Sequence, residues 1–415
     1  MSSVWTAFTP RSWRAQAARE PGSGRIWLLD PDLRSIGHHR RYSEGLKKAF
    51  ESLGHSVGLY GALRCPRHYA ARVGVNRVFS TSLYARGRDR QALPIRWLDS
   101  NAKLAVELAG ALRDMRADDT ILVHTTGGNH VLGYYAWYLT IPEPRPRICL
   151  QLMFPPNFGG AEADRAAAVE LMESSLRPWL NQDEKKVMLA VDNRRLGEDL
   201  HQLSGRNFPV LPMPIWAGPP PVRSGRRKDR PVLFLPGDLR REKGKGLIKS
   251  VMPELQSTNF SLLVQSTKRQ KWHRRRGLDV AALPPDYLHY LQLMMDADAV
   301  LLPYDPQAYA HRSSAAFIEA LGCGKPVLVS AGTAMADELE RLGAVGIIMR
   351  EQTSRALLDG MHELVRRLEE LTPQAERLAP EIRARHSASA FASELLGWAA
   401  RGGGLAQTAP PGRAP

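Results

Sequence analysis

The chain has 415 residues, and because single hydrophobic cores stop growing at roughly 250–300 residues we expect two domains. A hydrophobic content of 43% with 24% charged residues excludes collagen-like, disordered and disulfide-scaffold proteins as descriptions of the whole chain. Cys65, Cys149 and Cys323 lie far apart without a CxxC pair. The sequence therefore indicates neither a disulfide framework nor a metal site, and it favours a reducing compartment.

The net charge is +15, from 57 Lys and Arg against 42 Asp and Glu, which indicates an anionic partner. Residues 1–96 carry a net charge of +11 and residues 218–276 carry +12, whereas the rest of the chain is net −8. Two separate basic segments favour a cleft that receives an anion, or a face that lies on an anionic membrane. Solvated arginine-rich surfaces are the alternative interpretation.

The chain ends give weak targeting signals. Residues 1–24 lack the apolar region of a signal peptide, and no run reaches the roughly 18 apolar residues of a spanning helix. We therefore expect a cytoplasmic protein, with peripheral attachment at the inner face of the cell membrane as an option. Residues 1–24 are expected to form a disordered leader and residues 402–415 a disordered tail.

The first half alternates apolar runs with helical patterns. The strand RIWLLD is followed by the helical stretch YSEGLKKAFESLGH and by a second strand, SVGLYG, which together predict a βαβ unit. Three more apolar runs follow before the pattern ends near Ile215. We expect an N-terminal α/β domain over residues 25–215, with strands at 25–30, 56–61, 121–126, 147–154 and 187–192.

The second half repeats this organisation. Residues 216–230 are rich in Pro, Gly and charge and predict a linker. We expect a second α/β domain over 231–385 and a C-terminal helix over 386–401, with strands at 231–237, 260–266, 298–304, 325–331 and 345–350. Two doubly wound, Rossmann-like domains would direct the carboxyl ends of both sheets to a cleft between them, where such folds bind ligands.

A basic, glycine-containing loop follows the first strand of the second domain. The segment PGDLRREKGKGLIKS places Arg240, Arg241, Lys243 and Lys245 close to an expected helix start. Neither a P-loop nor a GxGxxG fingerprint follows a strand. The loop is consistent with a diphosphate site and equally with a tight turn that carries exposed cations.

A second candidate segment runs from Asp296 to Thr333. Its strand ends at Tyr304, Ser313 and Ser314 open a helix, and Glu319 lies within an apolar stretch of that helix. A carboxylate in apolar surroundings needs hydrogen-bonding partners, which a pair of ligand hydroxyls would supply. In the alternative interpretation the serines cap the helix and Glu319 is a surface acid.

Residues 25–400 resemble GT-B glycosyltransferases of the group-1 type, which use nucleotide-activated sugars. The family loop G-R-L-x-x-x-K-G corresponds to residues 237–244, and it includes Gly237 and the phosphate lysine, Lys243. Asp238 replaces the family arginine, so the resemblance assigns the diphosphate contact to Arg240 or Arg241. It implies a UDP-, GDP- or ADP-sugar as co-substrate, and no metal or permanently bound cofactor.

The second segment resembles the family pattern R-S-S-G-x-x-x-E, from Arg312 through Ser313 and Ser314 to Glu319, with alanine in place of glycine. The resemblance assigns Glu319 to the nucleotide ribose. His311 stands where many members have the glutamate that contacts the donor sugar, which places that contact in question. Tyr304 completes the expected donor side.

Histidines follow two strands of the first domain. Gly37, His38 and His39 occupy the loop after the first strand, and His124 lies near the end of another. Imidazole titrates near neutral pH, so His38 or His124 could act as a base and the whole set could orient an acceptor hydroxyl; structural roles are the alternative. Lys243 and Arg241 are expected to stabilise the leaving diphosphate. The resemblance favours a retaining course, in which no protein base is needed.

We therefore expect a glycosyltransferase that moves a sugar from a nucleotide diphosphate to a glycan, a lipid-linked sugar or another cell-surface precursor, as in polysaccharide biosynthesis. Asp238 and His311 favour an alternative, a non-catalytic protein that binds nucleotide sugars or glycans. An RNA-binding protein would interleave aromatic residues with its basic runs, but residues 268–277 contain a single tryptophan, so nucleic acid is not expected as a partner.

Overall fold

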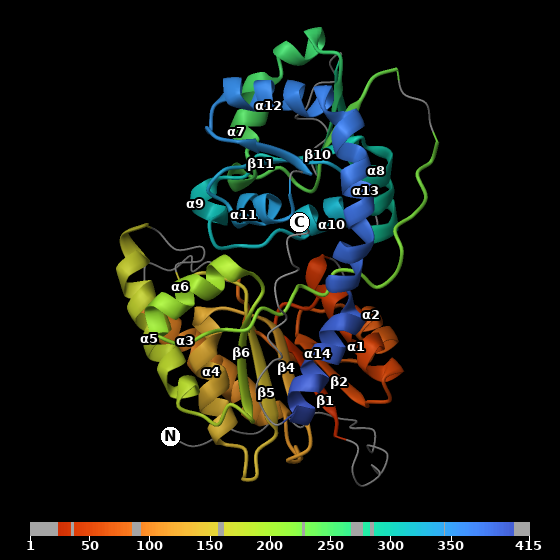
Figure 1. Cartoon of the computed structure of the whole chain (residues 1–415). Coiled ribbons are helices and arrows are strands. Elements are labelled where there is room, and N and C mark those ends of the chain that lie inside the picture. Colours follow the sequence, from red (N-terminus) through yellow and green to blue (C-terminus); the bar gives the residue numbers. More distant parts are fainter. Residues whose placement is uncertain are drawn as a thin grey trace.

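The structure is a computed structural model, and it describes residues 24–34, 37–84, 93–156, 162–225, 229–266, 277–282, 286–343 and 345–401. Two six-stranded parallel sheets, each flanked by helices, lie one above the other (Figure 1). The expected architecture of two doubly wound α/β units is confirmed.

The first sheet is built from short, largely buried strands. Its central strand β1 (IWLLD) is buried along its whole length, as expected for a parallel strand covered by helices on both faces. The strands are β1 (Ile26–Asp30), β2 (Val57–Ala62), β3 (Val75–Phe79), β4 (Thr120–Thr126), β5 (Arg147–Leu152) and β6 (Val187–Val191). The helices are α1 (His38–Ser52), α2 (Arg67–Val73), α3 (Leu93–Ala111), α4 (Gly128–Leu139), α5 (Arg165–Leu180) and α6 (Arg194–Ser204).

The second sheet has shorter strands and more helices around it. Its strands are β7 (Val232–Leu235), β8 (Ser261–Ser266), β9 (Leu278–Ala282), β10 (Ala299–Leu302), β11 (Val327–Ser330) and β12 (Gly346–Met349). Its helices are α7 (Lys245–Val251), α8 (Tyr287–Asp296), α9 (Pro306–Tyr309), α10 (Ala315–Gly322), α11 (Ala334–Arg341), α12 (Ser354–Arg366) and α13 (Leu368–Arg385). Short 3-10 helices occupy Glu162–Asp164, Arg241–Lys243 and Glu254–Ser257.

Both sheets have the same strand order. The first runs β3-β2-β1-β4-β5-β6, and the second, β12-β11-β10-β7-β8-β9, is the same order written from its other edge. In the first sheet, β2 and β3 lie on one side of β1 and β4 to β6 lie on the other, so the strand order switches sides between β1 and β4. In the second sheet it switches sides between β7 and β10. Ligands of such sheets bind at the carboxyl ends of the strands beside this switch point. The loops after these four strands are therefore the natural place for a site.

The sequence patterns did not predict β3 and β9. Both are edge strands, and each carries polar residues among its apolar ones, VNRVF in β3 and LDVAA in β9. These polar residues interrupt the apolar run by which strands are recognised, whereas the other two edge strands, β6 and β12, keep such a run and were predicted.

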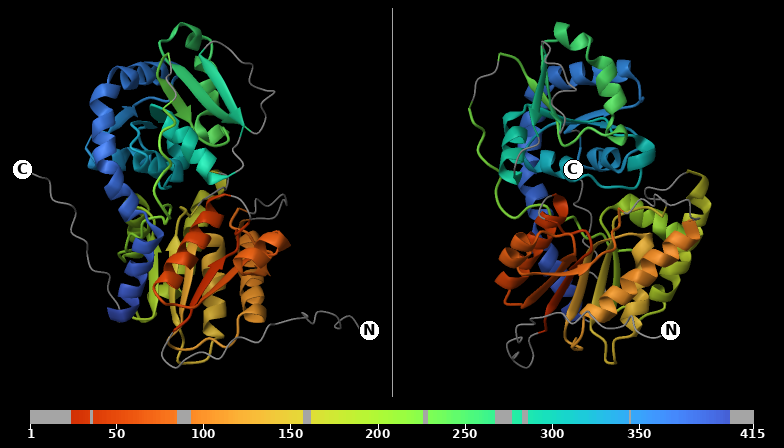
Figure 2. Two further views of the ribbon diagram at one scale, coloured as in Figure 1. Left: turned by 90° about the vertical axis from the view of Figure 1, so that its right-hand side faces the viewer. Right: turned by 180° about the vertical axis from the view of Figure 1, so that it is seen from behind.

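Two chain crossings join the halves. Trp216 pairs with the turn between α13 and α14 (Ala388–Arg401), because its N–H donates to the carbonyl of His386 at 2.9 Å and its carbonyl accepts from the Ala388 N–H at 3.0 Å. Helix α14 then returns to the first half, where it packs against α1 (Figure 2). Gly322 leaves room for the Trp216 indole, because a Cβ atom at position 322 would collide with this ring.

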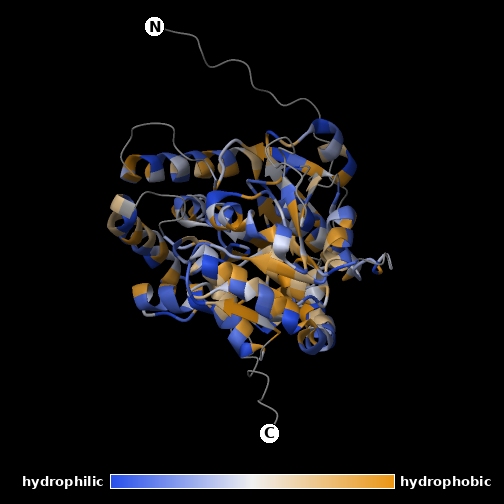
Figure 3. Cartoon of the chain, turned by 90° about the horizontal axis from the view of Figure 1, so that it is seen from above, coloured by the Kyte–Doolittle hydropathy of each residue, from blue (hydrophilic) through white to orange (hydrophobic). Residues whose placement is uncertain are grey.

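Hydrophobic residues are frequent in the strands of the sheets, and the helices alternate hydrophilic and hydrophobic residues along their length (Figure 3). One core cluster contains residues of both halves, Tyr42 and Met213 of the first with Phe317 and Ile318 of the second. This shared cluster fixes how the two sheets face one another. Among the described residues, no helix has the length and apolar character that crossing a membrane requires.

Candidate active site

A cavity of about 770 Å³ lies between the two halves, at the carboxyl ends of the strands. Polar and cationic side chains from both halves line it together with a group of apolar ones. The polar lining includes Asp32, Arg34, His38, His39, Arg96, Asn129, Asp192, Arg240, Glu242, Lys243, Arg312, Ser313 and Ser314.

His39 lies on this cavity in the first turn of α1, which begins directly after Gly37. Its Nδ1 is 2.8 Å from Oδ1 of Asp30, the last residue of β1, and its Nε2 is 3.1 Å from the Tyr84 hydroxyl. Burial lowers the pKa of His39, but the charge and hydrogen bond of Asp30 outweigh it, so the pKa is raised. Asp30 thus fixes the ring with Nδ1–H as donor and leaves Nε2 able to accept a proton.

Asp30 is itself held by its surroundings. The backbone N–H of Asp32 donates to Oδ1 at 3.0 Å, and the Ser43 hydroxyl donates to Oδ2 at 2.9 Å. Burial raises the pKa of Asp30, but the two neighbouring histidines, His39 and His124, lower it well below the usual value. The carboxylate is therefore ionised and suited to stabilise a positive charge on His39.

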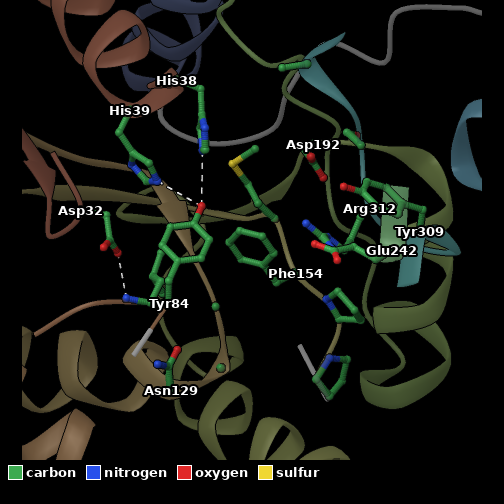
Figure 4. A pocket seen from close by; sticks show the side chains of 18 of the residues that line it. Asp32, His38, His39, Tyr84, Asn129, Phe154, Asp192, Glu242, Tyr309 and Arg312 are labelled. Atoms are coloured by element: carbon green, nitrogen blue, oxygen red, sulfur yellow. Dashed lines mark hydrogen bonds between the residues drawn. The ribbon is translucent and has the colours of Figure 1, made fainter. Parts of the chain in front are cut away.

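His124 lies behind this couple. It has no exposed surface and is outside the cavity lining; its Nε2 is 2.9 Å from the Ser43 hydroxyl and 3.4 Å from Oδ2 of Asp30. This position allows His124 to orient Asp30 through Ser43. His38 does line the cavity, and its Nε2 is 3.3 Å from the Tyr84 hydroxyl (Figure 4).

The opposite side of the cavity carries three cations from the second half, Arg240, Lys243 and Arg312. Burial lowers the pKa of Lys243, and Arg240 nearby lowers it further, so a bound anion would restore the favourable environment of the ammonium. The guanidinium of Arg312 stacks 4.5 Å from the centre of the Tyr309 ring.

The loop that carries Lys243 is shaped by a glycine. Gly244 has φ 79°, and a Cβ atom there would collide with the carbonyl oxygen of Pro303, the residue after β10. Only glycine combines this backbone conformation with such a close approach. Helix α7 begins at the next residue, Lys245, and has seven residues.

Ser313 and Ser314 lie at the start of α10, as predicted, and both line the cavity. The Ser314 hydroxyl accepts from the backbone N–H of Phe317 at 3.3 Å, so it caps the helix. Facing them is Asp192 at the end of β6. Burial raises the pKa of Asp192 to about 7, against the hydrogen bonds from Ser313 and Asn193 that lower it.

Glu319 occupies a different environment from the one expected for a ribose contact. It is 2% exposed and lies outside the cavity lining, where an Oε1 atom is 2.7 Å from a guanidinium nitrogen of Arg41 on α1. Oε2 accepts a hydrogen bond from Tyr290 at 2.8 Å. Arg41 also stacks 3.7 Å from the Tyr287 ring centre. A ribose contact by Glu319 would require Arg41 to move away.

Gly37 lines the cavity, whereas the remaining predicted site residues lie outside its lining. Arg241 is exposed, and Gly237 lies in the loop after β7. Tyr304 is buried beneath Lys243, whose Nζ is 5.3 Å from its ring centre. The His311 Nδ1 is 3.9 Å from an Asp199 carboxylate oxygen on α6. Their functional roles stay predictions.

Much of the positive charge behind the net +15 of the chain lies outside the described residues, including Arg226 to Lys228 and residues 268–276. The expected membrane or acidic-acceptor face therefore stays a prediction. So do the leader over 1–24, of which residues 1–23 lie outside the described residues, and the tail over 402–415, which lies wholly outside them. Within the described parts of the chain, no cluster of His, Cys, Asp and Glu has the arrangement of a metal site.

Sequence comparison finds no matching family model and no matching curated protein. Structural comparison matches nearly the whole chain to solved glycosyltransferases. The kitacinnamycin glycosyltransferase is 15% identical, with a TM-score of 0.60 over 91% of this chain and 99% of the other. The chain has the GT-B fold.

Two further GT-B structures show the range of the similarity. Sucrose-phosphate synthase from Thermosynechococcus elongatus is 14% identical, with a TM-score of 0.60 over 91% of this chain and 98% of the other. The spinosyn rhamnosyltransferase SpnG, solved with a spinosyn aglycone, is 17% identical, with a TM-score of 0.54 over 90% and 100%. The structural similarity establishes the GT-B fold. At identities this low it establishes the fold alone, so the function has to be argued from the site.

Proposed function

We propose that this protein is a glycosyltransferase that moves a sugar from a nucleotide diphosphate to an acceptor hydroxyl in the interdomain cavity. One observation carries the proposal: a buried His39–Asp30 couple on one wall faces the cations Arg240, Lys243 and Arg312 on the other. A base for the acceptor and positive charge for the leaving group are the two groups that such a transfer uses.

In the proposed reaction, Nε2 of His39 removes the proton of the acceptor hydroxyl as its oxygen attacks the anomeric carbon. The bond between that carbon and the diphosphate oxygen breaks, and the nucleoside diphosphate leaves with the electron pair. Asp30 stabilises the imidazolium, while Lys243, Arg240 and Arg312 stabilise the developing charge on the diphosphate. The Tyr84 hydroxyl, which contacts His39 Nε2 at 3.1 Å, must yield this position to the acceptor.

A single displacement of this kind inverts the anomeric configuration. The group-1 resemblance implied a retaining course, for which no protein base is needed; the orientation of His39 toward the cavity favours inversion. The anomeric proton coupling of the product, measured by NMR before the anomers equilibrate, distinguishes the two. A retained configuration would remove His39 from the role of base.

A non-catalytic nucleotide-sugar or glycan-binding protein is the second candidate. Such a protein needs the cations but has no use for a buried histidine oriented by a carboxylate, so the His39–Asp30 couple favours an enzyme. Calorimetric titration with UDP, GDP, ADP and their sugars tests donor recognition. We expect one nucleotide to bind at micromolar concentration, and binding of none would contradict the proposal. This experiment and the following ones identify the donor sugar, the nucleotide base and the acceptor.

A further inference from the structure

We propose that the first-half side of the cavity binds the flat apolar ring of an acceptor alcohol, and that it directs the ring's hydroxyl group to His39. This inference rests on the proposed function and narrows its acceptor to one chemical class. It differs from the glycan or lipid-linked sugar that the sequence suggested.

Apolar side chains form a patch on this side of the cavity, next to the polar lining residues Arg96, Asp99, Ser100 and Asn129. The apolar side chains come from the segment after β3, the start of α3, the loop after β5 and helix α5, and so converge from four parts of the chain. Two aromatic rings, Tyr84 and Phe154, meet edge to face with their centres 5.8 Å apart. The apolar lining residues are Leu83, Leu93, Trp97, Met153, Phe154, Pro155, Pro156 and Ala168.

Within this apolar patch there are few partners for the hydroxyl groups of a sugar. The side chains of Leu83, Met153 and Phe154 have no hydrogen-bonding atom in reach of a hydroxyl, and prolines lack even a backbone N–H. The indole N–H of Trp97 already donates to Ser175 at 3.2 Å. A glycan placed here would exchange water for apolar contacts at several hydroxyl groups, which is unfavourable. An apolar ring has no hydrogen bonds to water that it would lose in this place.

Two consecutive glycines keep the space open. A Cβ atom at Gly128 would collide with the Trp97 ring, so this glycine allows helix α4 to approach α3 closely. A Cβ at Gly127 would lie 3.4 Å from Cδ2 of Phe154 and 3.6 Å from Cδ2 of Leu83, among the apolar lining. Gly127 has an extended backbone with φ −147°, which any residue can adopt. A larger side chain at Gly127 would therefore fill the subsite without backbone strain.

The subsite adjoins the proposed base. The ring of Tyr84 packs against Phe154 on one side, and its hydroxyl contacts Nε2 of His39 at 3.1 Å (Figure 4). A ring alcohol stacked beside Phe154 would direct its hydroxyl to Nε2 of His39 once the Tyr84 hydroxyl has moved away from that atom. The polar group of the acceptor then meets His39 at the edge of the apolar patch.

The test measures binding by calorimetry with three ring alcohols, 2-naphthol, 7-hydroxy-4-methylcoumarin and 17β-estradiol, and with maltotriose as the glycan. Each is titrated into the full-length protein and into Gly127→Val. We expect at least one ring alcohol to bind the wild type, with affinity at least about tenfold lower in Gly127→Val because the valine occupies the ring's place. Maltotriose is expected not to bind.

Gly110→Val is the matched control, since Gly110 is exposed on α3 and a Cβ there meets no atom within 4 Å. It should bind the ring alcohol as the wild type does. Failure of all three ring alcohols to bind the wild type, or equal affinity in Gly127→Val, overturns the proposal, and so does maltotriose binding that Gly127→Val abolishes.

Nucleotide titrations of the same proteins keep the two proposals apart. Unchanged nucleotide affinity in Gly127→Val shows that the variant is folded and that its effect is confined to the acceptor side. If no nucleotide binds while ring alcohols bind in a Gly127-dependent way, the proposed function fails and the apolar subsite stands. If nucleotides bind and ring alcohols do not, the subsite fails and the proposed function stands.

Discussion

At the scale of single residues, the position of His39 follows from where β1 ends. The strand delivers Asp30 to the switch point, the chain turns through Gly37 with φ 88°, and α1 begins with the two histidines. A buried carboxylate next to an imidazole favours the protonated ring, which is why the pKa of His39 is raised despite its burial. A base with a raised pKa binds a proton more strongly. As the pH falls, it therefore becomes protonated and inactive at a higher pH than an isolated histidine does.

This arrangement predicts the pH dependence of transfer. The base must be neutral, so kcat/KM should fall as pH drops through the raised pKa of His39. Asp30→Asn removes the charge that raises this pKa, so the acid limb of the profile should move to lower pH. The plateau should also fall by about 10²–10⁴-fold, since the ring loses its orientation and charge stabilisation. An unshifted acid limb in Asp30→Asn would show that another group titrates.

Lys243 gives a second prediction at this scale. Hydrogen bonds to charged groups contribute about 1.5–3 kcal/mol, so Lys243→Met should weaken nucleoside diphosphate binding by roughly 10–100-fold. Lys249→Met is the control, because Lys249 is exposed on α7 and away from the cavity lining. Calorimetric titration with the nucleotide measures both variants. Equal affinities would place the diphosphate elsewhere in the cavity.

At the scale of elements, the loop between β7 and α7 depends on Gly244, which meets both a positive φ and the carbonyl oxygen of Pro303. Gly244→Ala should lower the free energy of unfolding by about 1–3 kcal/mol, because alanine strains this backbone and clashes with Pro303. Gly246→Ala is the control: Gly246 lies inside α7 with no atom within 4 Å of an added Cβ, and alanine favours helix there. Urea unfolding compares the two variants, and equal destabilisation would contradict the account.

The elements also show what sequence patterns can predict. Central parallel strands such as β1 and β4 are buried on both faces and form recognisable apolar runs, whereas the edge strands β3 and β9 do not. His38, His39, Lys243 and the two serines were found in the sequence because they follow strands or open a helix. Arg312 was found through the family resemblance. Asp30, Tyr84, Phe154 and Asp192 were missed, since their roles arise from packing between distant segments. The only signal for Asp30 and Asp192 was an acid at the end of an apolar run.

At the scale of the whole molecule, a buried ion pair joins the two halves. Arg41 of α1 contacts Glu319 of α10 at 2.7 Å, and Tyr287 and Tyr290 of α8 enclose the pair. Sequence analysis could find Glu319 as an acid among apolar residues, but the sequence contains no signal for its partner, because the pair forms only when both domains are in place. The structure thus gives Glu319 a role in holding the domains together.

Removing one partner of this pair tests that role. Arg41→Ala leaves the Glu319 carboxylate buried without its counter-charge, which should cost about 3 kcal/mol of unfolding free energy. Arg40→Ala, which removes the neighbouring surface pair with Glu44, should cost less than about 1 kcal/mol. Denaturant midpoints of the two variants provide the comparison. A midpoint for Arg41→Ala as high as that of Arg40→Ala would mean that the pair does not stabilise the closed arrangement.

We propose that the sugar is transferred in the cavity between the two halves, with His39 as the base. The most direct measurement is the release of nucleoside diphosphate from UDP-, GDP- and ADP-sugars in the presence of a ring-alcohol acceptor, for the wild type and for His39→Gln. We predict release from at least one donor by the wild type, accompanied by an acceptor whose mass has grown by one sugar, and a loss of about 10²–10⁴-fold in His39→Gln. Release at equal rates by both proteins would contradict the account.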